Sequence, residues 1–383
     1  MRIVHLIGGV DSRAGGPAMA MAGLCKAQRE AGLDVSVVAT FRAGRGRDIA
    51  DDLGAHGITV TLVGPAQGPL SNHPHLAATL RGVIQQTDVV HAHGIWEQVQ
   101  HEGAAICRQV GKPYVITPHG MLTPWSLKQK WLKKKLYMML RLRRDLEAAA
   151  ALHFTSAAEH DAVAPLKLKP KAIVEPLGVD LREFQTLPPR GTFRAKFPQI
   201  GGRKIVLFLG RLHPGKGVEY LIPAMADPGL EDAALVVAGP DSGGFQATLE
   251  QMAREHQLTG RVLFTGMLRG AERIEALTDA DVFALPSEHE NFGIVVVEAL
   301  ACGTPVIVSD GVALHGEVTA GEVGSSIAVG DVAALSQQLR KWLNDAELRR
   351  RTAERARPFA CERFDWAKIA GRWREHYARL EVV

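Results

Sequence analysis

Two kinds of stretch alternate along the chain: short runs of apolar residues, and longer stretches in which apolar residues recur every three or four positions. The apolar runs, such as residues 2–7 and 35–40, lack polar alternation, which indicates strands buried on both faces of a parallel sheet. The longer stretches predict amphipathic helices, and the one that starts near residue 18 ends at Gly32, a typical helix C-cap. Strands that alternate with helices predict an α/β fold with a doubly wound parallel sheet.

The alternation stops at a segment rich in proline and glycine and starts again near residue 204. Because 383 residues are too many for one compact core, we expect two Rossmann-like domains in tandem. The last helix is amphipathic and needs an apolar surface to cover it. The predicted parts are an N-terminal domain of residues 1–185, a linker of residues 186–203, a C-terminal domain of residues 204–362, and a helix of residues 363–383 that packs back on the first domain.

Composition narrows the class of protein. Hydrophobic residues make up 46% of the chain, and the four cysteines form no CxxC pair, which indicates reduced thiols and argues against a zinc site. The first residues do not resemble a signal peptide, and no run of about 18 apolar residues occurs. We therefore expect a cytoplasmic protein.

Positive charge is concentrated in the first half, where residues 1–190 carry 23 Lys and Arg against 16 Asp and Glu. A predicted helix of residues 125–147 holds eight Lys and Arg, all within residues 128–144, an interval without acidic residues. Its apolar stripe consists of Leu132, Leu136, Met139 and Leu140. This pattern suits an anionic membrane surface, but a core-facing stripe with a solvated basic back fits it equally well. Nucleic acid is not an expected partner, because the chain offers no recognition motif.

Two loops that follow apolar runs are candidate anion sites. Arg211 and Lys216 lie in GRLHPGKG, where a forked guanidinium and a point charge would suit a pyrophosphate, although a solvated basic turn is the alternative. Gly15 and Gly16 precede a helix and would let the backbone approach a phosphate, but an ordinary tight turn explains them almost as well. The GxGxxG fingerprint of NAD-binding proteins is absent from this loop.

A third loop, ENFGIVVVE, places Glu290 before a helix and Glu298 two turns into it. Gly293 and Ile294 open that helix with backbone N–H groups that have no partner within the helix. One carboxylate could accept hydrogen bonds from the hydroxyls of a ribose and the other from those of a sugar. Each glutamate alone also fits an ordinary surface position.

These two glutamates, together with GRLHPGKG, the paired glycines, TPHG and LGVD in the same order along the chain, resemble the signature of glycosyltransferase family 4. The resemblance covers nearly the whole chain. It implies the GT-B fold, in which two Rossmann-like domains face one another across a cleft. It also implies that the N-terminal domain takes the acceptor and the C-terminal domain takes the nucleotide-sugar donor.

The resemblance implies a role for each matching residue. Gly15 and Gly16 would approach the donor phosphates, and Arg211 and Lys216 would neutralise the diphosphate. Glu298 would bind the ribose. The remaining residues would surround the transferred sugar and its phosphate: Glu290, His119 and the backbone of Asn291, Phe292, Gly293 and Ile294.

The implied reaction is a retaining transfer of a hexose from a UDP-, GDP- or ADP-sugar, with no metal ion and no cofactor. Arg211, Lys216 and helix N-termini would stabilise the negative charge that grows on the diphosphate. The DAD segment, residues 279–281, has the letters of a metal-binding DxD motif, but it precedes a strand and is interpreted as a helix-to-strand turn. No residue stands out as a covalent nucleophile, so we expect the departing phosphate to assist acceptor deprotonation.

His91 and His93 are two residues apart on one predicted strand and therefore share a face. A metal site would need a third ligand, which the pattern does not supply. His93 and Trp96 are instead interpreted as lining the acceptor side.

The acceptor expected from the family is a glycan or a lipid-linked saccharide in cell-surface polysaccharide biosynthesis, at the inner face of the plasma membrane. Two other functions fit the same fold: a nucleotide-sugar 2-epimerase, and a nucleotide-sugar-binding module without activity. The segment from Glu290 through EALACGTPVI favours the transferase over the epimerase. The complete set of Arg211, Lys216, Glu290 and Glu298 argues against a module that only binds.

Overall fold

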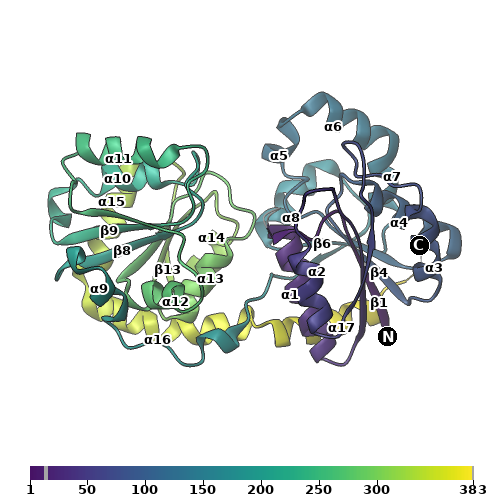
Figure 1. The fold of residues 1–383 in the computed structure, drawn as a ribbon. Coiled ribbons are helices and arrows are strands. Elements are labelled where there is room, and N and C mark those ends of the chain that lie inside the picture. The colour runs from purple at the N-terminus through teal and green to yellow at the C-terminus, as the bar shows by residue number, and fades with distance from the viewer. Residues whose placement is uncertain (13–15, 382–383) are drawn as a thin grey trace. The chain divides into compact units, whose positions relative to one another are not determined.

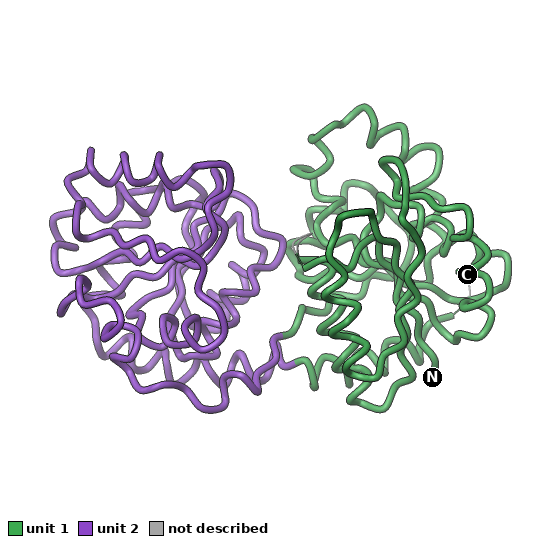
Figure 2. Tube along the Cα trace, in the orientation of Figure 1, with its two compact units in different colours: residues 1–178, 366–383 green, residues 179–365 purple. Residues whose placement is uncertain are grey.

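The computed structural model describes residues 1–12 and 16–381, which form two compact units (Figure 2). Unit 1 comprises residues 1–178 and 366–383, and unit 2 comprises residues 179–365. The chain therefore leaves unit 1 once and returns to it with its last helix. Residues 186–203, which the sequence pattern marks as a linker, lie within unit 2 and contain a short helix.

Unit 1 is built on a seven-stranded parallel sheet with strand order β3-β2-β1-β4-β5-β6-β7. Figure 1 shows this sheet with helices around it. Its strands are β1 (Arg2–Ile7), β2 (Asp34–Thr40), β3 (Thr59–Val63), β4 (Val89–His93), β5 (Tyr114–Thr117), β6 (Ala151–Phe154) and β7 (Lys171–Val174). Its helices include α1 (Gly16–Glu30), α2 (Asp48–Ala55), α3 (Leu76–Gln85), α4 (Gln98–Val110), α8 (Ala157–Val163) and α17 (Trp366–Ala378). The strand order reverses between β1 and β4, so the carboxyl ends of these two central strands form a topological switch point.

The two faces of this sheet are covered by different helices. Odd-numbered strand residues such as Ile3 and Val115 share a core with α1 and α17, whereas even-numbered residues such as Val4 and Ile116 share a core with α3 and α4. This period of two is what a strand imposes. Because both faces are buried, the strands read as continuous apolar runs in the sequence.

Helix α17 packs against α1, and two glycines make room for its first residue, Trp366. A Cβ atom at Gly23 would lie 2.6 Å from Nε1 of Trp366, and a Cβ atom at Gly178 would lie 2.3 Å from its Cδ2. Trp373 and Tyr377, further along α17, are buried in the core beneath the sheet. The amphipathic pattern of the last helix is thus explained by packing within unit 1.

Unit 2 repeats the architecture with a six-stranded parallel sheet of order β10-β9-β8-β11-β12-β13. Its strands are β8 (Lys204–Leu209), β9 (Ala233–Ala238), β10 (Val262–Gly266), β11 (Val282–Leu285), β12 (Val306–Ser309) and β13 (Gly324–Ile327). Its helices are α9 (Thr192–Lys196), α10 (Val218–Ala224), α11 (Phe245–Glu255), α12 (Gly270–Asp279), α13 (Ile294–Ala301), α14 (His315–Ala320), α15 (Val332–Asn344) and α16 (Ala346–Arg363). The switch point lies between β8 and β11. The prediction of two Rossmann-like, doubly wound parallel sheets is confirmed.

The single basic helix predicted for residues 125–147 is wrong. The segment is divided into α5 (Pro124–Lys128), α6 (Trp131–Tyr137), a π-helical turn (Met138–Leu142) and α7 (Arg143–Glu147). The first break occurs at Lys130, whose φ of 53° is left-handed and cannot continue an α-helix.

The apolar stripe on this segment does not face the core. Leu132, Leu136, Met139 and Leu140 are between 55% and 70% exposed, as are Trp125 and Trp131 at 52% and 53%. The alternative interpretation of the stripe as a core face is therefore wrong. Among the described helices, none is both long and apolar enough to span a bilayer.

Candidate active site

Two loops meet at the carboxyl ends of β8 and β11 in unit 2, beside the switch point. The backbone N–H of Glu288 donates to the carbonyl of Gly215 at 2.8 Å, which ties the loop after β11 to the loop after β8. Gly217 has a φ of 93°, and a Cβ atom there would lie 2.4 Å from the carbonyl oxygen of Pro286. Glycine at this position thus allows the two backbones to touch, and the contact sets the place of the preceding Lys216.

Lys216 and Glu290 form an ion pair across these two loops. Both side chains are partly exposed, at 21% and 27%, so the pair is open to solvent and to a ligand. Arg211, at the start of the first loop, is exposed, and its guanidinium has no partner among the described residues. The structure thus brings Lys216 and Glu290 together. Arg211 lies on the same loop as Lys216 but takes no part in this ion pair.

Glu298 lies on α13 and is 6% exposed. Its Oε1 accepts a hydrogen bond from Arg273 at 2.9 Å, while its Oε2 is buried without a hydrogen-bond partner among the described residues. Burial raises the pKa of this carboxyl to about 7, and the opposing effect of Arg273 is smaller. A buried acceptor without a donor is uncommon in proteins, and it indicates a place where a ligand donor fits.

Sequence reasoning missed Arg273 and Glu183 beside Glu298. Arg273 comes from α12, and its second terminal nitrogen donates to Glu183 at 2.6 Å. Glu183 and Arg273 are 90 residues apart, so no local spacing pattern connects them. A lone arginine on a predicted helix carries no signal of its own, and only the folded sheet reveals the contact.

Helix α13 begins at Ile294 after Gly293, which has a φ of 83° and acts as its N-cap. The first-turn N–H groups of the helix are therefore directed toward the loop that carries Glu290. Phe292 is 4% exposed, and its ring lies 6.0 Å from that of Phe364, so its side chain anchors the loop. Asn291 is partly exposed.

The predicted glycine loop of unit 1 is described only in part. Gly15 lies outside the described residues. Gly16 is the first residue of α1, where an added Cβ atom would meet open space.

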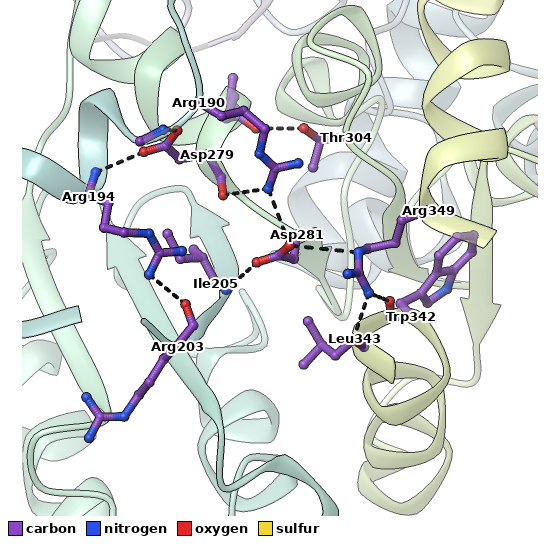
Figure 3. Close-up of polar contacts among 12 residues, drawn as sticks. Arg190, Arg194, Arg203, Ile205, Asp279, Asp281, Thr304, Trp342, Leu343 and Arg349 are labelled. Carbon is purple, nitrogen blue, oxygen red and sulfur yellow. Dashed lines mark hydrogen bonds and ion pairs between the residues drawn. The ribbon is translucent and has the colours of Figure 1, made fainter. Parts of the chain in front are cut away.

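The DAD segment connects α12 to β11, as expected for a helix-to-strand turn. Its two aspartates bind neighbouring backbone and side-chain groups (Figure 3). Asp279 accepts hydrogen bonds from the backbone N–H groups of Gly191 at 2.5 Å and Arg194 at 2.9 Å. Asp281 accepts from the backbone N–H of Ile205 at 2.8 Å and pairs with Arg190 and Arg349. Both carboxylates are thus engaged by groups of the protein at the amino ends of β8 and β11.

His119 follows β5 in unit 1 and is partly exposed. Its φ of 51° is unusual for a residue with a side chain. Glu159 of α8 supports this turn, because its carboxylate accepts from the backbone N–H of Gly120 at 2.5 Å and from that of Thr155 at 2.8 Å. Burial lowers the pKa of His119 to about 3, so its imidazole is neutral.

The interpretation of His93 as lining the acceptor side needs correction, because its side chain is buried. His93 is 3% exposed, and its two ring nitrogens are hydrogen-bonded to His5 and His119. Both of its ring nitrogens are therefore engaged within the protein. Trp96 is partly exposed, with the ammonium of Lys134 5.1 Å from its ring centre, and its acceptor-side role stays a prediction.

Two family models match the chain. The model for glycosyl transferases group 1 matches residues 189–359, and the model for a glycosyl transferase 4-like domain matches residues 15–178. These ranges correspond to the bodies of unit 2 and unit 1.

Individual relatives agree with these matches. A glycogen synthase of Mycobacterium tuberculosis is 32% identical over 295 residues, which are 74% of this chain and 66% of the relative. A phosphatidyl-myo-inositol mannosyltransferase of Mycobacterium leprae is 36% identical over 205 residues, or 52% of this chain and 51% of the relative. The matched regions thus span about half to two thirds of the length of these curated relatives.

A solved structure of the Anabaena protein HepE in complex with UDP resembles the whole chain. Its TM-score is 0.84 at 23% identity, with 99% of this chain and 100% of that chain covered. At this identity the likeness establishes a shared fold.

Proposed function

This chain belongs to the glycosyl transferases group 1 family, glycosyltransferase family 4 with the GT-B fold, and from this premise we propose that it transfers a sugar from a nucleoside diphosphate sugar to an acceptor hydroxyl. The observation that carries the proposal is Glu298. Its buried Oε2 has no hydrogen-bond donor in the part of the chain that the structure describes, and it lies at the switch-point end of a Rossmann-like sheet, where nucleotides bind. A ribose offers hydroxyl donors suited to that oxygen.

The diphosphate would lie against Arg211, Lys216 and the start of α13. Arg211 can make a forked contact with phosphate oxygens, and its guanidinium has no protein partner among the described residues that a phosphate would have to displace. Lys216 would exchange part of its contact with Glu290 for a contact with the leaving group. These charges stabilise the diphosphate as the bond to the anomeric carbon breaks.

The transferred sugar would lie near Glu290 and His119. Glu290 is held by Lys216, an arrangement that suits hydrogen bonding to sugar hydroxyls and leaves its carboxylate partly neutralised. We propose retention at the anomeric carbon without a covalent sugar–enzyme bond. The departing phosphate would then accept the proton of the attacking hydroxyl.

The proposed reaction uses neither a metal ion nor a cofactor. The chemistry that a metal would supply, neutralisation of the leaving group, falls to Arg211, Lys216 and helix N-termini. The engagement of Asp279 and Asp281 by protein donors supports this proposal, because the DxD letters are used in folding contacts.

The proposed acceptor is a glycan or a lipid-linked saccharide used in cell-surface polysaccharide biosynthesis. A relative named for phosphatidyl-myo-inositol supports an acceptor with a lipid portion. The exposed leucines of residues 131–142 lie among lysines and arginines, which suits an anionic membrane surface. We propose that the protein is cytoplasmic and binds peripherally to the inner face of the plasma membrane through this segment.

A thermal-shift panel of nucleotides and nucleotide sugars tests the donor class. A ligand that binds the folded state raises its apparent stability by mass action. We expect UDP, GDP or ADP, and the matching nucleotide sugar, to raise the melting temperature of the wild type but not of Glu298→Ala. If no nucleoside diphosphate stabilises the wild type at millimolar concentration, the proposed function is wrong.

A further inference from the structure

A polar stripe crosses the face of the unit 1 sheet that α1 and α17 cover. Four neighbouring strands, β1, β4, β5 and β6, contribute odd-numbered positions to this face toward their carboxyl ends, where the apolar pattern is interrupted. The residues of the stripe are His5 on β1, His91 and His93 on β4, Thr117 on β5 and His153 on β6. All five side chains are buried, at 3% exposure or less, so every polar atom needs a partner from the protein.

Gln28 of α1 and Tyr377 of α17 complete the stripe into one continuous chain of hydrogen bonds. The hydroxyl of Tyr377 accepts a hydrogen bond from the side-chain amide nitrogen of Gln28 at 3.0 Å. The same hydroxyl is hydrogen-bonded to Nδ1 of His91 at 2.7 Å. From His91 the chain runs to Thr117, to Nδ1 of His153 and to the backbone carbonyl of Glu175, at distances of 2.7, 2.8 and 2.7 Å. In the other direction it runs from Gln28 to His5, His93 and His119, at 2.8, 2.9 and 3.1 Å.

The direction of this chain is set at its Glu175 end. A carbonyl oxygen only accepts hydrogen bonds, so Nε2 of His153 must carry a proton. A neutral imidazole has one N–H, so Nδ1 of His153 accepts from the hydroxyl of Thr117. Thr117 has used its proton and therefore accepts from Nε2 of His91.

The direction continues through Tyr377. Nδ1 of His91 must accept, so the hydroxyl of Tyr377 donates to it and receives a proton from the amide nitrogen of Gln28. The amide oxygen of Gln28 then faces His5, which is the orientation found. The orientation of the Gln28 amide therefore agrees with the direction that the carbonyl of Glu175 sets at the other end of the chain. The contacts at these two places are independent of one another.

His5 consequently donates through Nε2 to Gln28 and accepts through Nδ1 from His93. His93 donates through Nε2 and accepts through Nδ1 from Nε2 of His119. Burial supports the neutral state that this assignment needs, since it lowers the pKa of His5 and His153 to about 4 and of His119 to about 3. All eight hydrogen bonds then run from His119 toward Glu175.

Three of these histidines offer another interpretation, a metal site. One ring nitrogen from each of His5, His91 and His93 lies within 4.8 Å of the others, and His5 is the third imidazole that the sequence pattern did not reveal. However, the nitrogens of His5 and His93 that face one another are 2.9 Å apart and joined by a hydrogen bond. A zinc ion bound about 2.0–2.1 Å from these two nitrogens and from one nitrogen of His91 would have to replace this bond and the bond of His91 to Tyr377 or to Thr117.

We propose that this chain of hydrogen bonds holds His119 as the neutral tautomer protonated at Nε2, so that its Nδ1 accepts a hydrogen bond from a hydroxyl of the transferred sugar. Nδ1 has no partner among the described residues, and His119 as a whole is partly exposed. Tyr377 and Gln28 are positioning residues, because they act on the ligand only through His119. The fixed tautomer follows from unit 1 alone, whereas the hydroxyl ligand rests on the proposed function.

Nitrogen NMR of the full-length protein labelled with ¹⁵N-histidine tests the tautomer without any substrate. The two ring nitrogens of each neutral tautomer resonate at distinct positions, and loss of signals in His119→Gln assigns this residue. At pH 7 we expect His119 to be protonated at Nε2 alone. Protonation at Nδ1, or on both nitrogens, would overturn the proposal, as would stoichiometric binding of zinc by His5, His91 and His93.

Tyr377→Phe tests the chain itself. It keeps the ring in the core but removes the hydroxyl, so the Gln28 amide is free to turn and His119 is expected to populate both tautomers. Thr117→Val interrupts the chain at a second point and should have the same effect. The matched control is Tyr114→Phe, which removes a buried hydroxyl of the same unit that donates to the carbonyl of Asp145 at 2.6 Å and lies outside the chain.

The outcomes separate the two parts of the proposal. If His119 keeps a single Nε2-protonated tautomer in both Tyr377→Phe and Thr117→Val, the chain does not control it. Added UDP-glucose, GDP-mannose or ADP-glucose should move the His119 Nδ1 resonance of the wild type when the thermal-shift panel reports binding. Binding without that movement overturns the hydroxyl contact alone, and absence of binding contradicts the proposed function and leaves the tautomer result standing.

Discussion

The two carboxylate oxygens of Glu298 have different surroundings. Its Oε1 pairs with Arg273 at 2.9 Å, whereas its Oε2 is buried without a donor among the described residues. Burial also raises its pKa to about 7, so the charged form that best accepts from a ribose is not fully populated near neutrality. Binding of a nucleotide and ionisation of Glu298 are therefore coupled.

This coupling predicts a pH dependence of nucleotide affinity. The free carboxyl is protonated below its pKa of about 7, and hydroxyl donors favour its charged form, so affinity should rise several-fold from pH 6 to pH 8. Glu298→Gln should bind about 10- to 100-fold more weakly, as expected for loss of a charged acceptor, and lose this rise. Calorimetric titrations of the stabilising nucleotide at both pH values measure this. An equal slope in wild type and variant would assign the titration to another group.

Folding stability should show the opposite trend for the same group. The pKa of Glu298 in the folded state lies above its ordinary value of 4.5, so the folded state binds the proton more tightly. Its contribution to stability is complete below pH 4.5 and is lost as pH rises through about 7. The wild type should therefore lose more stability than Glu298→Gln between pH 5 and pH 8 in urea unfolding, and a larger loss in the variant would contradict the assignment.

Among the elements, the segment from α5 to α7 exposes apolar side chains that packing within unit 1 does not explain. Three of its leucines, Leu132, Leu136 and Leu140, and both of its tryptophans are more than half exposed and lie among basic side chains. A bilayer with anionic lipids satisfies both features at once, because the apolar side chains enter the interface and the lysines contact the headgroups.

A flotation assay tests this element. The wild type should float with vesicles that contain anionic lipid at low salt, and a Leu136→Ser/Leu140→Ser variant should remain largely unbound because it loses two apolar anchors. Met267→Ser, which changes an apolar residue of unit 2 that is 54% exposed, close to the 55% of Leu136, is the control and should float like the wild type. Equal flotation of all three proteins, or none by the wild type, would contradict membrane binding through this segment.

Helix α17 is an element whose packing depends on small residues. A Cβ atom at Gly23 would lie 2.6 Å from Nε1 of Trp366, so Gly23→Ala should destabilise the protein by about 1–3 kcal/mol through overpacking. Gly371→Ala on α17 meets nothing within 4 Å and should be neutral or stabilising by up to about 1 kcal/mol. Urea unfolding compares the two, and equal effects would show that Trp366 can move aside without cost.

Most elements could be predicted from sequence because burial leaves a periodic trace. The apolar runs predicted β1 and β8, and the recurrent aromatics predicted α17. The break at Lys130 could not be predicted, since a left-handed lysine has no compositional signature. The same distinction holds for the site: Glu290 and Glu298 share one motif, but Arg273 reaches Glu298 from another helix, and Tyr377 reaches His91 across 286 residues.

For the whole molecule, the proposed function assigns substrate-contacting residues to each unit. Unit 1 contributes the neutral His119 with its fixed tautomer, and unit 2 contributes Arg211, Lys216 and Glu290. A neutral imidazole adds no positive charge where the sugar itself becomes positive in the transition state. The cations belong at the diphosphate, where negative charge grows.

Release of nucleoside diphosphate from UDP-, GDP- and ADP-sugars by the full-length protein tests the central claim most directly. We expect slow release from one donor class without acceptor, faster release with a saccharide or lipid-linked acceptor, and a loss of about 100-fold or more in Lys216→Met, which removes charge at the leaving group. No release from any donor, with or without acceptor, by a protein that the same nucleotides stabilise would indicate a binding module and contradict the proposed transfer.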